Sequence, residues 1–397
     1  MIKAVLLDLD DTLLINPDSV FVVAYLGAID RFFTDLWGQS LSQALLKTLP
    51  VMNGQRDMVM TNADIALSII RQAAIDQDEE EIQAAFQQFY AKVYPHLQSC
   101  SQPVAIAPEL VDYLKQKKYA VVIATNPLYP ADATYRRLAW AGLPDTPESY
   151  ALVTHNENMH FTKNHAAYYA EIVARVGVEP DEAIMVGDSL NNDMHPAQQA
   201  GLSVFHVTAQ SHHENGIPSG TLTDFYHRVS QDNWLETLVP PAISPGMILP
   251  ELTGNIGGLF GLLADVQPHH WEQHPDPEEW SLIQTVCHLL ESEAAVQRPR
   301  MERILQQANP FLVPPQAPPG PHDARICHQD GWDAAQDFAQ ERRKTLDLVR
   351  TFKQDDWSRP ARHSIFGRTT LLEMAHFTAQ HDRLHINQLC QTLGRCE

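Results

Sequence analysis

Short apolar runs alternate with helical patterns in the first 237 residues of the chain. Four of the runs have the length and the mainly apolar character of buried strands. They are residues 4–7, 120–124, 183–186 and 203–207. Two further segments, 108–118 and 165–176, have the periodicity of helices. Strands that are separated by helices predict a parallel α/β sheet.

One stretch interrupts this alternation. Residues 16–100 are mostly helical in pattern, as in 79–93, where Ile82, Phe86 and Phe89 share one face. The stretch follows the first predicted strand directly. It is therefore predicted to be a helical insertion in the α/β domain.

The chain changes character at residues 238–250. Four prolines in this short stretch oppose both helix and central strand, so it is predicted to be a linker. Beyond it no strand pattern is convincing, and four segments have helical periodicity. They are residues 249–266, 281–307, 331–353 and 370–393. The simplest packing is an all-α four-helix bundle over residues 251–397.

Two of these helices begin with sequences typical of a helix N-terminus. Ser281 with Gln284, and Thr370 with Glu373, fit capping boxes. A proline-rich segment at 310–321 separates the second and third helices. A plain connector is the simpler interpretation of that segment, and a stiff lid is the alternative.

Composition excludes some classes of partner. Acidic residues outnumber basic ones by 49 to 28, a formal net charge of −21. Such a surface repels phosphate backbones and anionic lipids, so we expect neither nucleic acid nor a membrane as partner. The longest strongly apolar run, residues 20–29, is too short to span a bilayer. The five cysteines are widely spaced and form no CxxC pair, which predicts reduced thiols in a soluble cytoplasmic protein.

Chemically active residues follow three of the predicted strands, at the edge where parallel sheets place their ligands. The motifs are D-L-D-D-T-L with Asp8 and Asp10, A-T-N with Thr125 and Asn126, and D-S-L-N-N-D with Asp188 and Asp193. Lys163 lies between the last two motifs. Carboxylates suit Mg²⁺, and a lysine with a hydroxyl suits a phosphoryl group. The set predicts a site for both.

These motifs, in this order, resemble those of the haloacid dehalogenase-like (HAD) hydrolases over about residues 1–230. The resemblance implies a Rossmann-like sheet in a domain at 1–237, with the insertion at 16–100 as a helical cap over the site. It also implies that Asp8 is the nucleophile that forms an aspartyl-phosphate. Asp10 resembles the general acid/base.

The other site residues receive roles from the same resemblance. Thr125, beside Asn126, resembles the hydroxyl that holds the phosphoryl group, and Lys163 resembles the cation that screens nucleophile and phosphate. Asp188 resembles a ligand of Mg²⁺, together with Asp8 and the backbone carbonyl of Asp10. Asp193 resembles the second acid of the same loop, which acts either on the metal or on the lysine. Lys163 departs from many relatives, because asparagine and not proline follows it.

Asp10 also bears on the type of reaction. Dehalogenase relatives have no acid at this position, since a halide leaves without a proton, whereas an alkoxide leaving group needs one. The resemblance therefore implies a phosphatase acting on a small phosphorylated metabolite, with a phosphomutase still open. Asn53, Arg56 and Asn62 lie in polar breaks of the cap, where ordinary loop polarity is a simpler interpretation than substrate contact.

A second candidate site lies in the predicted bundle. The chain has 19 histidines, and spacing singles out three of them. His381 and His385 are four residues apart on the last helix, so both imidazoles face the same side. His288 lies among apolar residues on the second helix. Three histidines with an open position are typical of a catalytic metal site, whereas Glu291 and Glu293 are predicted to be a solvated face.

The bundle sequence resembles the DinB-like metal-binding bundles over residues 246–394. The resemblance rests on Trp280-Ser281 before the helix of His288, and on the terminal H-x-x-x-H-x-x-Q that ends at Gln388. It implies that His288, His381 and His385 bind Zn²⁺ or Ni²⁺. Because some such bundles are thiol-dependent transferases, a metal-dependent transferase or hydrolase activity is one alternative for the whole chain. A non-enzymatic role in sensing, or in forming a homodimer, is another.

Overall fold

The computed structural model describes every residue except 55–56, 75, 210–215, 314–319, 329 and 397. The residues group into two compact units. The first comprises Met1–Tyr169, Pro180–Gln198 and Leu202–Pro241, and the second comprises Ala170–Glu179, Gln199–Gly201 and Ala242–Glu397.

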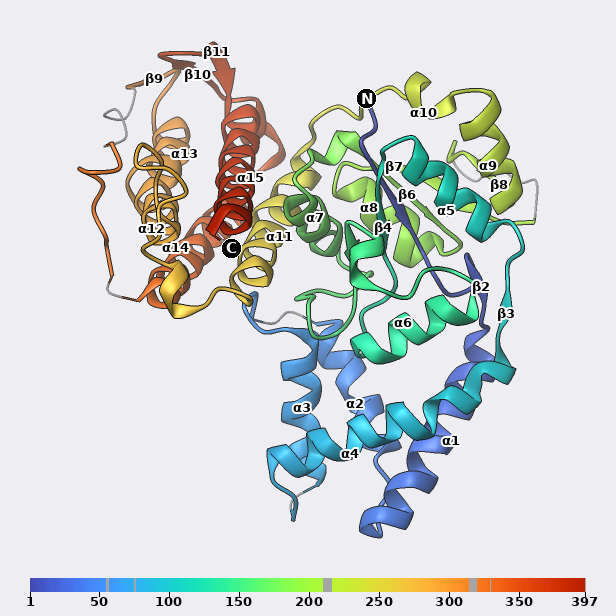
Figure 1. Ribbon diagram of the computed structural model, residues 1–397. Coiled ribbons are helices and arrows are strands. Elements are labelled where there is room, and N and C mark those ends of the chain that lie inside the picture. Colours follow the sequence, from blue (N-terminus) through green and yellow to red (C-terminus); the bar gives the residue numbers. More distant parts are fainter. Residues whose placement is uncertain (55–56, 75, 210–215, 314–319, 329, 397) are drawn as a thin grey trace. The chain divides into compact units, whose positions relative to one another are not determined.

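A six-stranded parallel sheet, in the order β5-β4-β1-β6-β7-β8, forms the centre of the first unit (Figure 1). Its strands are β1 (Ala4–Leu7), β4 (Ala120–Ile123), β5 (Leu152–Val153), β6 (Ala183–Gly187), β7 (Ser203–Val207) and β8 (Ser219–Gly220). The four predicted strands are confirmed, whereas β5 and β8 are too short to give an apolar pattern. Because Val5 pairs with both Val121 and Ile184, the carboxyl ends of β1, β4 and β6 lie side by side.

Helices connect the strands, and both predicted helices are present. The helices are α5 (Ala107–Gln116), α6 (Ala131–Trp140), α7 (Ala166–Val176), α8 (His195–Gln199), α9 (Leu222–Gln231) and α10 (Trp234–Thr237). Shorter turns are the 3₁₀ helices η2 (Pro147–Ser149) and η3 (Pro180–Glu182) and the π-helical turn η4 (Leu190–Met194).

The insertion after β1 is helical, as predicted. It contains α1 (Asp18–Trp37), α2 (Ser42–Met52), α3 (Asn62–Ala73), α4 (Glu79–Lys92) and the 3₁₀ helix η1 (Tyr94–Cys100). Figure 1 shows α1 to α4, in blue, as a group of their own. The antiparallel pair β2 (Leu14–Ile15) and β3 (Gln102–Pro103) joins the two ends of the insertion. Buried aromatic residues such as Phe21 and Tyr94 make its interior continuous with the core of the sheet.

Four helical segments dominate the second unit, where they lie side by side in Figure 1. They are α11 (Pro245–Leu263), α12 (Leu282–Ser292) continuing into α13 (Arg298–Gln306), α14 (Gly331–Arg350) and α15 (Leu371–Cys396). The π-helical turn η6 (Glu293–Gln297) joins α12 to α13, and two 3₁₀ turns are η5 (Pro268–His270) and η7 (Gln354–Ser358). The capping boxes at Ser281 and Thr370 are both confirmed.

The structure shortens the predicted linker at 238–250. Helix α11 begins at Pro245, so the last six residues of that stretch are helical. Proline is compatible with the first helical position, because first-turn residues donate no hydrogen bond within the helix. Pro250 lies inside the helix, where its missing N–H removes only one backbone hydrogen bond of the helix.

The second unit also contains strands that the sequence pattern did not predict. Strands β9 (Phe311–Leu312), β10 (Pro360–His363) and β11 (Gly367–Thr370) form a small sheet in the order β11-β10-β9. Each is too short for an apolar alternation to stand out. β9 occupies the start of the proline-rich segment at 310–321, whose residues 314–319 lie outside the described part of the chain.

Cys287 and Cys327 form a disulfide, so the prediction of reduced thiols is wrong for this pair. The end of the proline-rich stretch lies along α12, where the Gln284 side chain donates to the carbonyl oxygen of Pro321 at 2.9 Å. This return of the chain brings together two cysteines that are 40 residues apart, which spacing alone could not reveal.

The prediction that Glu293 is solvated is also wrong. Its carboxylate is fully buried and receives two hydrogen bonds from the Arg342 guanidinium, at 2.8 and 2.9 Å. Arg342 also donates to Asp382 at 2.7 Å. Glu291, by contrast, is exposed as predicted.

Among the described helices, none has both the length and the apolar character that crossing a membrane requires.

Candidate functional site

The carboxyl ends of β1, β4 and β6 open into a cavity of about 630 Å³. Its lining contains every candidate residue that the first domain's motifs supplied: Asp8, Asp10, Thr125, Asn126, Lys163, Asp188 and Asp193. The sheet order explains this convergence, because the three motif-bearing strands are immediate neighbours. Cap residues such as Val22 and Leu46 line the same cavity.

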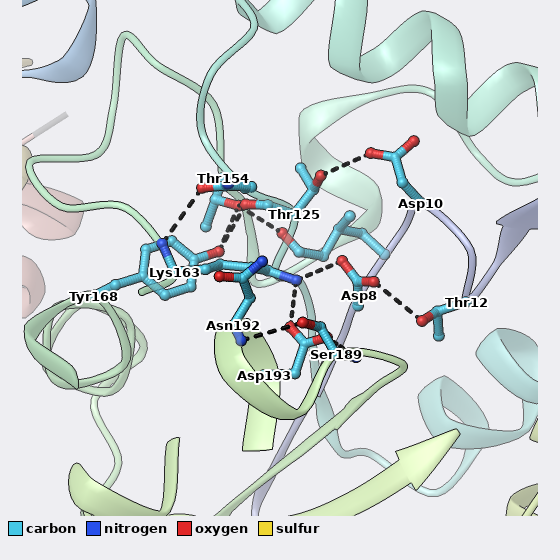
Figure 2. A network of polar contacts seen from close by, with 12 residues as sticks. Asp8, Asp10, Thr12, Thr125, Thr154, Lys163, Tyr168, Ser189, Asn192 and Asp193 are labelled. Carbon is cyan, nitrogen blue, oxygen red and sulfur yellow. Dashed lines mark hydrogen bonds and ion pairs between the residues drawn. The ribbon is translucent and has the colours of Figure 1, made fainter. Parts of the chain in front are cut away.

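The Lys163 ammonium lies between two buried carboxylates. Its Nζ is 2.5 Å from Asp8 Oδ1 and 2.6 Å from Asp193 Oδ1 (Figure 2). Thr12 Oγ1 donates to the second Asp8 oxygen at 3.0 Å. Lys163 is only 3% exposed. Although burial lowers the pKa of this ammonium, the charges of Asp193 and Asp8 raise it further, so the lysine stays protonated.

A glycine allows the third motif to approach this centre. A Cβ atom at Gly187 would stand 2.4 Å from Asp193 Oδ2, closer than atoms can come. Asp193 is held in this position by the backbone N–H of Ser189, which donates to Oδ2 at 3.0 Å. Gly187 therefore fixes how near the Asp193 carboxylate lies to β6.

Asp10 points in another direction. Figure 2 shows its carboxylate turned away from Lys163 and toward the Thr125 hydroxyl, which donates at 3.3 Å. Asn16 Nδ2 donates to Asp10 Oδ1 at 2.8 Å. The guanidinium of Arg137 forms an ion pair with Asp10 Oδ2.

Arg137 belongs to none of the predicted motifs. The signal was available, because Ala133, Arg137 and Trp140 share one face of α6 and the two hydrophobic residues are buried. A charged residue in such a stripe needs a buried partner. The partner lies 127 positions away, and only the fold identifies it as Asp10.

The loop that carries Lys163 is fixed from both sides. Asn126 Oδ1 accepts a hydrogen bond from the backbone N–H of Lys163 at 3.3 Å. The cap residue Asn53 accepts one from Thr162 Oγ1 at 2.9 Å, and Asn62 Nδ2 donates to the Phe161 carbonyl at 3.3 Å. These two asparagines thus hold the loop, and neither is among the residues described as lining the cavity. Arg56 lies outside the described residues.

The donor set fits a hard divalent cation. Asp8, Asp188 and Asp193 each offer a carboxylate oxygen, and these atoms lie within 4.8 Å of one another. Burial, together with Asp193, raises the pKa of Asp188. Three carboxylates facing one ammonium leave excess negative charge, which Mg²⁺ would neutralise. The Asp10 side chain is not part of this group.

The predicted histidines also come together, in the bundle. His288 on α12 and His381 and His385 on α15 offer ring nitrogens within 4.8 Å of one another. The two Nε2 atoms of His288 and His381 are 3.3 Å apart. Burial and the neighbouring rings lower the pKa of His288 to about 3 and that of His385 to about 4, so both rings are neutral at pH 7. Neutral imidazoles are the form that binds metals.

Further contacts orient these rings. Gln388 Oε1 lies 3.0 Å from His385 Nδ1, so a proton on Nδ1 leaves Nε2 free for a metal. The Trp280 ring stacks on His385 at 6.2 Å with an interplanar angle of 13°. His376, by contrast, lies 3.0 Å from a Glu251 carboxylate oxygen and outside the cluster.

A family model described as haloacid dehalogenase-like hydrolase matches residues 2–201, which is half of the chain. The chain belongs to the haloacid dehalogenase-like hydrolases. A second family model, for the DinB superfamily, matches residues 251–389 of this HAD hydrolase. Both resemblances inferred from motifs are thereby confirmed.

A search of curated proteins finds no relative that matches the HAD hydrolase. Among solved structures it is similar to a HAD phosphatase from Thermococcus onnurineus, with 20% identity, a TM-score of 0.38, and coverage of 57% of this chain and 97% of the other. It is also similar to a 2-haloacid dehalogenase from Pseudomonas syringae pv. Tomato DC3000, with 21% identity, a TM-score of 0.42, and coverage of 60% and 99%.

Proposed function

We propose that this HAD hydrolase is an Mg²⁺-dependent phosphatase of small phosphorylated metabolites. The observation that carries the proposal is the position of Lys163 between Asp8 and Asp193, in a cavity that Asp10 and Thr125 also line. This arrangement presents a nucleophile, a permanent positive charge, a hydroxyl donor and a separate acid to one substrate.

The residues divide the reaction between them. An Asp8 oxygen attacks phosphorus, the bond to the leaving oxygen breaks, and Asp10 gives that oxygen its proton. Asp10 then removes a proton from water as the water attacks the aspartyl-phosphate, which releases phosphate and restores Asp8. Lys163 and Thr125 hold the phosphoryl oxygens throughout. Asp8, Asp188, Asp193 and the Asp10 carbonyl would hold Mg²⁺, which supplies charge neutralisation when bound.

The acid at position 10 favours a phosphate ester, with its alkoxide leaving group, over an organohalide as the substrate. Loss of a halide requires no proton, whereas an alkoxide is a poor leaving group unless it is protonated. Asp10 has a solvent-accessible carboxylate, 28% exposed, that lines the cavity. This supports phosphomonoester hydrolysis over dehalogenation.

The test is a screen of phosphorylated metabolites with the full chain and Mg²⁺, following release of inorganic phosphate. Asp8→Asn should reduce turnover of the best substrate to background without changing the circular dichroism spectrum, because an amide cannot form the acyl-phosphate. Asp112→Asn, on the exposed face of α5, is the matched control and should keep wild-type turnover. Turnover by a folded Asp8→Asn protein would disprove the mechanism.

A second function is favoured by a separate observation, the convergence of His288, His381 and His385. We propose that the bundle binds Zn²⁺ or Ni²⁺ through these rings and has an open coordination position. Metal content of the purified full chain should fall in His381→Ala and remain in His376→Ala, which removes a histidine of the same helix outside the cluster. Undiminished metal in His381→Ala would exclude the triad. A transferase or hydrolase reaction at this centre, and a homodimer through the bundle, stay predictions.

A further inference from the structure

Three donors from three separate segments hold the Asp10 carboxylate. Asn16 donates to Oδ1 at 2.8 Å, while Thr125 donates to Oδ2 at 3.3 Å. The Arg137 guanidinium pairs with the same Oδ2. Figure 2 shows the result: Asp10 lies beside Thr125, apart from the cluster that Asp8 forms with Lys163.

Arg137 is almost completely buried, with 1% of its side chain exposed. Among the described residues, Asp10 is the single carboxylate in an ion pair with it. The Tyr129 ring covers the guanidinium, with 4.7 Å between the ring centroid and Arg137 Cζ. The Nε atom of Arg137 has no hydrogen-bond partner. A buried guanidinium is costly unless a counter-charge accompanies it. At this position the counter-charge is a residue that faces the cavity.

This asymmetry distinguishes the pair from a purely structural salt bridge. The structural pair of the bundle, Arg342 with Glu293, buries both partners fully and joins them through two hydrogen bonds. In the pair of Arg137 and Asp10, one partner is fully buried and the other lines the cavity. The Arg137 guanidinium is thus fixed in the interior, while the Asp10 carboxylate that it holds faces the cavity.

We propose that Arg137 is a positioning residue for proton transfer to the leaving group, an inference that rests on the proposed phosphatase function. Because Arg137 and Thr125 both donate to Asp10 Oδ2, that oxygen has no room for a proton, and the transferable proton belongs on Oδ1. The Asn16 amide, which donates to Oδ1, releases this oxygen when it is protonated. When the P–O bond breaks, this proton moves to the leaving oxygen and Asp10 becomes a carboxylate facing Arg137. Water returns the proton in the second half-reaction, and Arg137 stays protonated throughout.

The test compares two substrates whose leaving groups differ in their need for a proton. The substrate with the poor leaving group is the alkyl phosphate that is turned over fastest in the metabolite screen. The substrate with the good leaving group is 2,4-dinitrophenyl phosphate, whose phenolate leaves unprotonated. Arg137→Gln should lower kcat/KM about 10²-fold for the alkyl phosphate and less than about threefold for the dinitrophenyl ester, because general acid catalysis contributes about 10²–10⁴-fold only where a proton is needed. Arg137→Lys, which keeps the charge, should restore most of the alkyl phosphate activity.

Two controls separate positioning from mere destabilisation. Arg136→Gln removes the exposed neighbouring arginine of α6 and should leave both substrates unaffected. In the Asp10→Asn background, Arg137→Gln should cause no further loss for the alkyl phosphate, because the residue it positions is already disabled. Equal losses for both substrates in Arg137→Gln, or additive losses in the double variant, would overturn the proposal.

The design also covers a variant that does not fold. If Arg137→Gln is insoluble, the ratio of the two kcat/KM values in Arg137→Lys decides, and an unchanged ratio with reduced activity counts against positioning. Asp10→Asn alone reports on the proposed function. If it affects both substrates equally, Asp10 is not the acid and the phosphatase mechanism fails, whatever Arg137 does.

Discussion

The bundle core contains a buried charge whose removal should have a large and specific effect. Arg342 on α14 is fully buried and donates to Glu293 on η6, to Asp382 on α15 and, at 3.2 Å, to the Leu252 carbonyl oxygen of α11. One guanidinium thus joins four helical segments. Arg342→Met keeps much of the side chain's apolar volume and removes every one of these hydrogen bonds.

The magnitude follows from what stays behind. The side chains of Glu293 and Asp382 are 0% and 3% exposed, so the substitution leaves two buried carboxylates without the Arg342 cation. Breaking a buried pair by removing one partner costs about 3–5 kcal/mol. At a denaturant dependence of about 2 kcal/mol per molar urea, a loss of about 4 kcal/mol moves the midpoint by about 2 M.

Arg350→Met provides the matched control. It lies on the same helix and pairs with Asp347 at 2.7 Å, but 50% and 73% of these side chains are exposed. Because exposed pairs contribute at most about 1 kcal/mol, its midpoint should hardly move. Hydrogen exchange of α12, α14 and α15 peptides across a urea series measures the stability of the bundle separately from that of the first unit.

A third variant tests the cause. Adding Glu293→Gln and Asp382→Asn to Arg342→Met neutralises both stranded carboxylates, so the triple variant should be more stable than the single one. The reasoning is refuted if Arg342→Met stays within about 1 kcal/mol of wild type, the range of an exposed pair. It is refuted equally if the triple variant is no more stable than Arg342→Met.

Three further predictions concern other features. Cys287→Ser should destabilise the bundle by about 4 kcal/mol in urea unfolding, because the disulfide to Cys327 closes a loop of 40 residues. Gly187→Ala should lower kcat about 10²-fold in the phosphate-release assay without unfolding the protein, because its Cβ displaces Asp193 from Lys163. Since the pKa of His288 is about 3 in the fold and about 6.5 when unfolded, acid favours the unfolded state. In thermal scans the metal-free protein should therefore lose stability as pH falls below about 6.5.

Each of these predictions has its own control. Cys390→Ser removes a free thiol and should leave stability unchanged. Gly394→Ala adds a methyl group to α15 with nothing within 4 Å, so any activity loss there would show that the Gly187 effect is not steric. Thermal stability that is constant between pH 6.5 and 4 would contradict the low pKa of His288 in the fold.

Local patterns predicted much of this fold, and the reasons are visible in particular residues. The strand Ala4–Leu7 is apolar at every position because it is buried on both faces, and its two neighbours have the same pattern. The motifs follow strands directly, so predicting the strands was enough to bring Asp8 near Asp188. The histidines of α15 share a face through helical spacing alone.

What sequence could not predict depends on pairing between distant segments. Arg137 meets Asp10 across 127 positions, and Arg342 meets Glu293 across 49, without any local signal that names the partner. Glu293 belongs to a polar-looking stretch, yet a π-helical turn directs it into the core. Partners of buried charges are therefore identified by the fold, whereas the presence of a buried charge can be inferred from an arginine in an apolar stripe.

The π-helical turn at Glu293–Gln297 also limits how this chain tolerates insertions and deletions. Pro299 cannot donate to the carbonyl four residues earlier, and a wider turn before it avoids that clash. The turn holds one residue more than an α-helix would, and its greater width absorbs that residue without turning α13 by a further 100°. Deleting a single residue here would restore α-helical geometry with Met301 and Ile304 still facing the interior, whereas a single-residue deletion in the regular turns of α12 would turn α13 by about 100°. A one-residue deletion in α12 would therefore repack one face of the bundle, whereas the same deletion in the π-helical turn would bring the Pro299 ring against the carbonyl four residues earlier.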